Sequence, residues 1–216
     1  MMYLTQVTHS VFFMRQILIL TFIFPAFISI AQKDLTVILQ ENVKYRAEMN
    51  AEFADPKTSP LEKKDIPKFD SLPFFPIDTA YYVISRLERI ENGKVFEMPT
   101  TTERRPQYRL YGVAHFTLQG QGVALPVYQN LRLQKTPGYE DYLFVPFTDH
   151  TNGEETYGGG RYLDVRIPDG DELILDFNKA YNPLCAYSDR FSCPIPPKEN
   201  AIQMRIPAGV QYVPHH

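Results

Sequence analysis

Two long segments of the sequence carry most of the side chains that could bind or transform a ligand. They span residues 148–160 and 178–200, and connections longer than about 12 to 15 residues in a compact domain are usually functional or disordered. Carboxylates, amides, phenols and a guanidinium can together bind a small polar molecule through hydrogen bonds and ion pairs. The candidate ligand-binding residues are Asp149, Tyr157, Arg161, Asn178, Tyr181 and Glu199.

A glycine run at the end of the first segment is the most suggestive feature. Tyr157-Gly158-Gly159-Gly160-Arg161 could present successive backbone N–H groups beside a guanidinium, an arrangement that suits a carboxylate or phosphate oxygen. Arg161 is therefore the candidate anion anchor. No helix is expected after the run, which excludes a nucleotide phosphate loop. The alternative is that the glycines allow a wide turn while Arg161 pairs with Asp149 or Asp176 in a structural ion pair.

The chain has two cysteines, Cys185 and Cys193, both in the second segment. In an oxidising compartment they most simply form a disulfide that closes this proline-rich loop. As a nucleophile, Cys185 would need a base such as His150, and Asp149 is the other candidate catalytic residue. These four side chains are of types that bind zinc, but their spacing matches no close-paired zinc motif. We predict the disulfide, no metal and no cofactor.

The N-terminus has the pattern of a secretory signal peptide over residues 1–31. An uncharged run, Ile17–Ile30, follows Arg15 and ends at the small-x-small sequence Ser29-Ile30-Ala31. A membrane span needs about 20 apolar residues and would not usually end in such a site. We expect cleavage after Ala31, a periplasmic or secreted protein, and no membrane anchor after cleavage.

The start of the chain and its division into parts follow from this signal. Met14 is the natural start of the signal, so residues 1–13 would be an extension from a mis-assigned start codon, although Met1 stays open as the true start. After the signal we expect an N-terminal helical and irregular segment over 32–77, packed on a sheet, and a β-rich domain over 78–216.

The segment 32–77 begins with helical spacing. Apolar residues recur about every three to four positions from Asp34 to Phe53, and Asp55-Pro56 should end this helix. The sequence Ser59-Pro60-Leu61-Glu62 predicts a short second helix, because a capping hydroxyl precedes proline and glutamate. The aromatic and proline-rich stretch Phe69–Pro76 has no regular period and should lie across a sheet face.

After Asp78 the apolar residues alternate with a period of two, which is typical of strands. Asn92-Gly93 and Gly120-Gln121-Gly122 suit hairpin turns, and about eight strands with an N-terminal helical segment predict an antiparallel β-sandwich or barrel. In this topology both long segments open at the same end of the sheet. The predicted strands are Tyr81–Ile90, Lys94–Met98, Tyr108–Leu118, Val123–Leu133, Tyr142–Phe147, Tyr162–Ile167, Glu172–Phe177 and Ala201–Ile206.

The same two segments also carry a family resemblance. The motifs are Phe147-Thr148-Asp149-His150-Thr151-Asn152-Gly153, Thr156-Tyr157-Gly158-Gly159-Gly160-Arg161-Tyr162-Leu163, Asp176-Phe177-Asn178-Lys179-Ala180-Tyr181-Asn182-Pro183 and Cys193-Pro194-Ile195-Pro196-Pro197-Lys198-Glu199-Asn200. Together they resemble DUF1684, a bacterial and archaeal domain of unknown function. The resemblance covers most of the mature chain, supports a bacterial protein that is periplasmic after export, and implies no particular activity.

Composition narrows the function classes further. A net charge of −3 without a block of like charges lacks the signature of a nucleic-acid-binding protein. We predict an exported protein that binds a small polar or anionic ligand between the segments 148–160 and 178–200. Two alternatives stay open: a periplasmic hydrolase that uses loop carboxylates or a Cys/His pair, and a structural partner domain of the cell envelope that makes contact through Phe69–Pro76. Whether the protein is an enzyme and whether it forms oligomers are left open.

Overall fold

The computed structural model describes the backbone of residues 24–212 and the side chains of residues 35–212. Residues 1–23 of the predicted signal peptide lie outside the described residues, whereas the predicted cleavage site after Ala31 lies within a helix. Cleavage stays a prediction. Within the described range, no helix is both long and apolar enough to cross a membrane.

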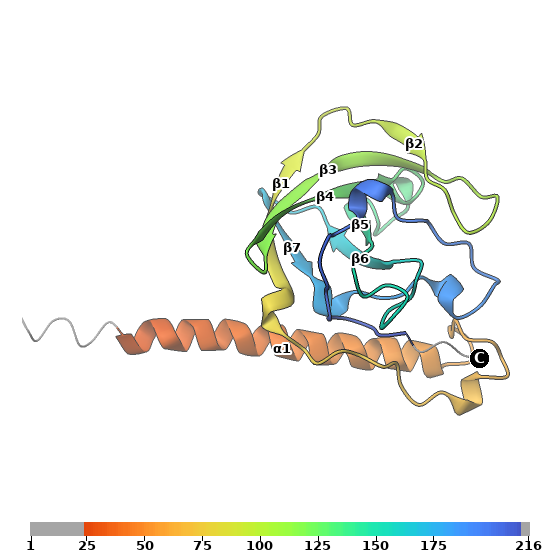
Figure 1. Ribbon diagram of the computed structural model, residues 1–216, viewed down its shortest axis with the longest axis horizontal. Coiled ribbons are helices and arrows are strands. Elements are labelled where there is room, and N and C mark those ends of the chain that lie inside the picture. Colours follow the sequence, from red (N-terminus) through yellow and green to blue (C-terminus); the bar gives the residue numbers. More distant parts are fainter. Residues whose placement is uncertain (1–23, 213–216) are drawn as a thin grey trace, which may run out of the picture.

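One long helix, α1 (Phe24–Ala54), runs along one side of the β strands, and its N-terminal part extends past them (Figure 1). The helix ends directly before Asp55-Pro56, as predicted, but it begins ten residues before Asp34, so Asp34 does not cap it. Asn42 is fully buried, and its Nδ2 donates to Oδ2 of Asp176, 2.7 Å away at the end of a strand. This bond ties the helix to the sheet.

The predicted short second helix does not begin at Ser59, and the next helical element is the 3-10 turn Ile66–Lys68. Ser59 Oγ does accept a hydrogen bond from the amide of Leu61 at 3.2 Å, so the capping hydroxyl is present. However, Glu62 accepts a hydrogen bond from Ser188 Oγ, and the Ser59 carbonyl accepts one from Arg190 at 2.5 Å. These long-range contacts engage the groups that a helix start would need, so the segment is irregular.

The β strands form one antiparallel sheet of seven strands that curls into a nearly closed barrel (Figure 1). The neighbours follow the order β6-β5-β4-β3-β1-β7, and β2 pairs with β3 beside this path. The mainly antiparallel β fold with an N-terminal helix is therefore confirmed. The strands are β1 (Tyr82–Arg89), β2 (Val95–Glu97), β3 (Gln107–Leu118), β4 (Gln121–Asn130), β5 (Tyr142–Phe147), β6 (Arg161–Arg166) and β7 (Glu172–Asp176). Six 3-10 turns accompany them: η1 (Ile66–Lys68), η2 (Thr79–Tyr81), η3 (Leu133–Lys135), η4 (Phe177–Lys179), η5 (Leu184–Ala186) and η6 (Lys198–Asn200).

One predicted hairpin is correct and the other is wrong. β3 and β4 pair up to Leu118 and Gln121. The two central residues of the turn, both with positive φ, are Gln119 and Gly120, so the turn begins one residue earlier than predicted. β1 and β2 do not pair with each other, because both pair with β3 and follow one another along it. The segment between them also runs alongside β3, and a Cβ on Gly93 would lie only 1.8 Å from the Leu110 carbonyl oxygen.

The predicted last strand, Ala201–Ile206, is not a strand. It makes one isolated parallel bridge, between Ala201 and Thr148. Its alternation reflects burial instead, since Ile202, Met204 and Ile206 all pack into the main core.

The sheet buries different residues on its two faces. The larger cluster is mostly aliphatic and includes Leu125, Leu143 and Val145, whereas the smaller one is mostly aromatic and includes Tyr108 and Phe144. Successive residues of a strand point to opposite faces of the sheet. β3 has a register shift between Leu110 and Gly112, so even-numbered residues before the shift and even-numbered residues after it point to opposite faces. Tyr108 therefore joins the aromatic cluster, while Phe116, also at an even position, joins the aliphatic one.

Candidate functional site: an aromatic cavity beside the sheet

The two long segments meet, as predicted. The amide of Thr148, in the first segment, donates to the carbonyl of Asn200, in the second, at 3.1 Å. Tyr162, just after the first segment, and Tyr181 exchange backbone hydrogen bonds of 2.9 and 3.1 Å. Chain segments that are distant in sequence therefore form one end of the barrel.

At this end Arg161 and Asp149 are buried against each other. Both side chains have an exposed fraction of zero, and Arg161 Nη2 donates to Oδ2 of Asp149. The guanidinium also donates to the carbonyls of Ile206, at 2.8 Å, and Ala208. Burial lowers the pKa of Arg161, and the Asp149 carboxylate opposes that shift. The structural ion pair is the arrangement observed, and no atom of either side chain faces solvent.

Asp149 also holds its own turn. Its Oδ1 accepts the amide of Thr151 at 2.6 Å, and its own amide donates to Asn152 Oδ1 at 2.6 Å. Gly160 has a φ of 92°, and a Cβ there would lie 2.7 Å from the Phe147 carbonyl oxygen. The glycine run therefore allows the chain to pack closely before it enters β6.

The other predicted ligand-binding residues are separated. Asn178 is fully buried and bonds both backbone groups of Asp78, at 2.9 Å each, so it links two chain segments. Glu199 is exposed on η6. Tyr157 is half-buried, with its ring 5.2 Å from that of Tyr212, and burial raises its pKa to about 12. Of the six predicted residues, Tyr181 alone is among those that line the cavities described below.

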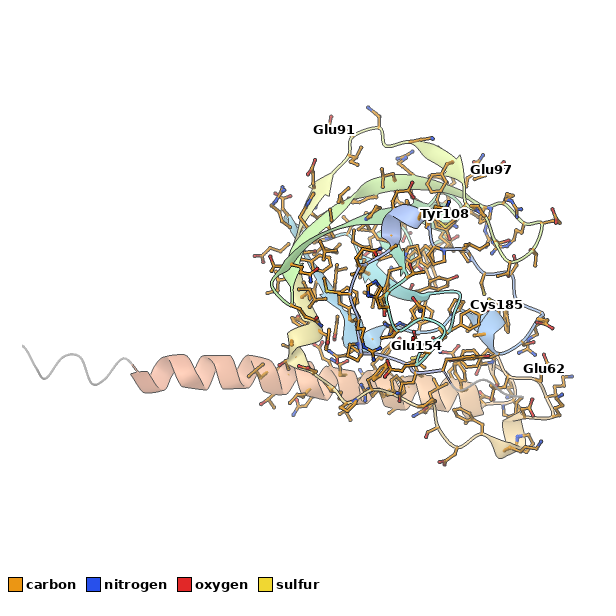
Figure 2. The ribbon with its side chains drawn as sticks, in the orientation of Figure 1. Glu62, Glu91, Glu97, Tyr108, Glu154 and Cys185 are labelled. Atoms are coloured by element: carbon orange, nitrogen blue, oxygen red, sulfur yellow. The ribbon has the colours of Figure 1, made fainter. Side chains whose placement is uncertain are left out.

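Cys185 and Cys193 are free thiols in this structure and do not form the predicted disulfide. The Cys185 amide donates to Cys193 Sγ at 3.1 Å, so the backbone brings the residues together without joining the sulfurs. Hydrogen bonding from Cys193 is the main cause that lowers the Cys185 pKa to about 7, and Tyr157 and Thr101 add to it. The Cys193 pKa is raised. Figure 2 shows Cys185 on the loop near the C-terminal end of α1.

An aromatic cavity lies between α1, the aromatic face of the sheet and residues 184–194. Its volume is about 490 Å³, within the range of small-molecule sites. The rings of Tyr108 and Phe144 lie 5.7 Å apart, and those of Phe144 and Tyr162 lie 4.7 Å apart. Tyr108, labelled in Figure 2, belongs to β3 and lines this cavity. The aromatic lining includes Tyr45, Phe53, Tyr108, Tyr142, Phe144, Tyr162, Tyr181 and Phe191.

Asp164 places a carboxylate at the wall of this cavity. The hydroxyls of Tyr142 and Tyr181 both donate to its Oδ1, each at 2.8 Å. Protein around the carboxylate raises its pKa above the ordinary value, and the two hydroxyls and Arg166 oppose this shift. Burial, followed by the charge of Asp164, raises the pKa of both tyrosines, so they stay protonated donors.

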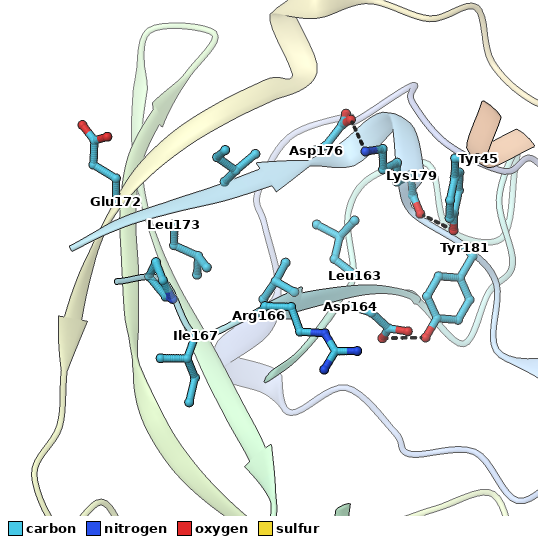
Figure 3. Close-up of a pocket in the computed structure, with 13 residues that line it drawn as sticks. Tyr45, Leu163, Asp164, Arg166, Ile167, Glu172, Leu173, Asp176, Lys179 and Tyr181 are labelled. Atoms are coloured by element: carbon cyan, nitrogen blue, oxygen red, sulfur yellow. Dashed lines mark hydrogen bonds and ion pairs between the residues drawn. The ribbon is translucent and has the colours of Figure 1, made fainter. Parts of the chain in front are cut away.

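A second cavity, of about 420 Å³, fills the open seam between β6 and β7 (Figure 3). Tyr45, Asp164 and Tyr181 line both this seam and the aromatic cavity, so they form a shared wall. Asp164 has exposed surface, and Figure 3 shows its carboxylate directed at the Tyr181 hydroxyl. Tyr45 is fixed there because its hydroxyl donates to the Lys179 carbonyl at 2.9 Å.

The sequence of β6 contains a pattern that indicates part of this site, although β6 lies outside the two long segments. Tyr162, Asp164 and Arg166 alternate with apolar residues on β6, so they share the face opposite the main core. On this face Asp164 lies between Tyr162 and Arg166, so the pattern places a carboxylate beside the aromatic cluster to which Tyr162 belongs. Tyr142 approaches the same carboxylate because β5 pairs with β6, and this pairing puts Tyr142 opposite Arg166.

The fold and cavity define a class: a β-rich, barrel-like domain with an aromatic cavity outside its main core. Residues 67–211 match the model of the protein family of unknown function DUF1684, and the chain belongs to that family. It is also similar to an uncharacterised protein of Haloarcula marismortui with a solution NMR structure. The identity is 34%, the TM-score is 0.64, and the match covers 84% of this chain and 96% of that one. A search of curated proteins finds no significant match.

Proposed function

We propose that this chain is an exported protein that binds a small molecule with a planar ring in the aromatic cavity. The observation that carries the proposal is a row of neighbouring aromatic rings along a cavity of ligand size, with the Asp164 carboxylate and two tyrosine hydroxyls at its wall. Aromatic side chains stack on planar ligands, and a few fixed polar groups set the orientation.

The site overlaps only part of the region that the sequence suggested. It uses Tyr181 and residues 184–194 from the second segment, while the first segment supplies none of its lining. A polar edge of the ligand can donate a hydrogen bond to Asp164 or to the oxygen of either tyrosine hydroxyl, because both hydroxyl protons are already donated to Asp164. The site therefore suits a ring that carries N–H or O–H groups.

Binding is tested with N-phenyl-1-naphthylamine, a neutral aromatic dye whose emission rises in apolar surroundings. We expect saturable binding of one dye per chain. Leu133→Trp puts a larger side chain at the cavity wall and should weaken binding about tenfold or more, equivalent to about 1.4 kcal/mol.

The matched control is Leu39→Trp, at a residue of α1 that is 42% exposed and does not line the cavity. It should bind the dye like the unmodified protein. Absence of saturable binding, or equal weakening in both folded variants, would reject the cavity as the site.

Export is tested separately by mass spectrometry of the protein recovered from a bacterial host. The signal pattern predicts a mature chain that begins at Gln32 in the periplasm or medium. A chain that keeps residues 1–31 and stays in the cytoplasm would contradict it.

A further inference from the structure

A third space, here called the basic hollow, adjoins the aromatic cavity and is lined by several basic side chains. Its volume is about 850 Å³, and none of the residues that line it is acidic. Four of them carry a positive charge: Arg104, Arg105, Arg132 and Lys135. The whole chain has a net charge of −3, so this concentration of cations is a local feature and not the general character of the surface.

The basic hollow and the aromatic cavity share part of their lining. Arg104, Asn130 and Arg132 line both the basic hollow and the aromatic cavity. A molecule with its ring against Tyr108 and Phe144 can therefore extend a charged group between the two arginines. The positive charges of Arg104 and Arg132 also act on the Tyr108 hydroxyl, where they lower its pKa against the larger effect of burial.

The backbone that carries Arg132 is held in place. Oδ1 of the buried Asn130 accepts the amides of Arg132 and Leu133, each at 3.0 Å. The Arg132 guanidinium itself makes no hydrogen bond or ion pair with any residue in the described part of the chain. A fixed backbone and an unengaged guanidinium suit an arginine that receives an external anion.

Arg104 is oriented from the opposite side. Its Nε donates to Ser192 Oγ at 3.1 Å, and its Nη2 donates to the Ser192 carbonyl at 2.5 Å. Ser192 belongs to the loop that lines the aromatic cavity. Arg104 is thus anchored by the same loop that helps to enclose the ring.

From this juxtaposition we propose that the ligand is an aromatic phosphate monoester, the chemical class of mononucleotides. The ring occupies the aromatic cavity, and the phosphate lies in the basic hollow between Arg104 and Arg132. Two guanidinium groups match phosphate oxygens with paired, charge-assisted hydrogen bonds. This inference rests on the proposed function, because it assigns the part of the ligand that extends beyond the cavity.

The test compares three probes that separate ring from charge: 1-naphthol, 1-naphthyl phosphate and inorganic phosphate. Titrations of the full chain follow naphthyl fluorescence and, for inorganic phosphate, competition with the ester. We expect the ester to bind about tenfold or more tightly than naphthol, equivalent to about 1.4 kcal/mol. The gain should shrink as salt rises, because exposed charges are screened.

Arg132→Gln should abolish the gain from the phosphate, so that the variant binds the ester no more tightly than it binds naphthol. Arg86→Gln is the matched control, because its side chain is 66% exposed and it lines neither space. It should keep the gain.

The outcomes separate the two claims. Equal affinities for the ester and for naphthol, with dye binding still weakened by Leu133→Trp, would reject the phosphate and leave the cavity proposal standing. Inorganic phosphate that binds as tightly as the ester would reject the aromatic part of the ligand. Failure of all ring probes, including the neutral dye, would reject both.

Discussion

Two polar clusters of this protein differ in what their charged groups contact. Asp149 and Arg161 lie at the barrel end with no exposed side-chain surface, and the protein itself supplies the partners of both. At the aromatic cavity, Asp164 accepts two tyrosine hydroxyls but keeps exposed surface, and Arg132 has an unengaged guanidinium. The first cluster is therefore suited to holding loops together and the second to receiving a molecule.

This comparison shows why residue type alone is a weak guide to a site. An arginine and an aspartate beside glycines are typical of both an anion site and a buried ion pair, and only burial separates the two. The loss of a buried partner is costly because it leaves a charge without compensation, whereas an exposed charge is easily replaced.

The largest effect is expected at the buried pair. Arg161→Met should lower the free energy of unfolding by about 3–5 kcal/mol, because it leaves the Asp149 carboxylate buried without its partner. Urea unfolding followed by circular dichroism measures the change. Arg132→Met, at the cavity mouth, should change stability by less than about 0.5 kcal/mol. Similar losses in the two variants would remove the distinction between the clusters.

The bond between helix and sheet should have the next largest effect. Asn42→Ala removes the donor that Asn42 Nδ2 offers to Asp176 and should cost about 1–3 kcal/mol of unfolding free energy. Val43→Ala is the control on the same helix, since Val43 is 60% exposed. If both substitutions cost the same, the buried amide does not anchor α1.

The thiols should differ in reactivity. With a Cys185 pKa of about 7, the thiolate fraction rises about tenfold between pH 6 and pH 8, and so should its alkylation rate by iodoacetamide. Cys193, whose pKa is raised, should react little. Tyr157→Phe removes a hydrogen bond that lowers the Cys185 pKa, so the midpoint should move to higher pH.

Peptide mass spectrometry assigns each alkylated site and also detects the disulfide as a loss of two hydrogens. Cys185→Ser should remove the fast reaction. A midpoint near pH 9 in the unmodified protein would show that these contacts do not activate the thiol.

The smallest effect is expected at Asp164. Its raised pKa means that the folded state holds the proton more tightly than the unfolded chain, so this group stabilises the fold below its ordinary value of 3.8. That contribution is lost as the pH rises through the raised pKa. Asp164→Asn lacks it, so the variant should gain stability relative to the unmodified protein between pH 3 and pH 7.

The gain should stay below about 1 kcal/mol, because solvent at the cavity screens the carboxylate. Urea unfolding at several pH values gives the difference. Tyr181→Phe removes one hydrogen bond that opposes the shift, so it should enlarge the pH dependence. A difference that is flat with pH would contradict the raised pKa.

Local patterns in the sequence were enough for much of the fold. Alternation over Tyr108–Leu118 predicts β3 to within one residue of its start at Gln107, and Asp55-Pro56 marks the end of α1. These features depend on neighbours within a few residues, namely side-chain period and backbone restriction by proline. Alternation also predicts a strand at Ala201–Ile206, and this prediction is wrong, because a segment packed on a core can alternate in burial without a strand partner.

The candidate site depended on contacts between distant parts of the chain. The sequence determined the residue types, the strands and the meeting of the two long segments, since these follow from periodicity and strand direction. Only the tertiary structure decided that Arg161 is enclosed with Asp149, while Asp164 and Arg132 face open space. The physical reason is that solvent access depends on how α1, the sheet and residues 184–194 pack around a group, and no local pattern encodes that packing.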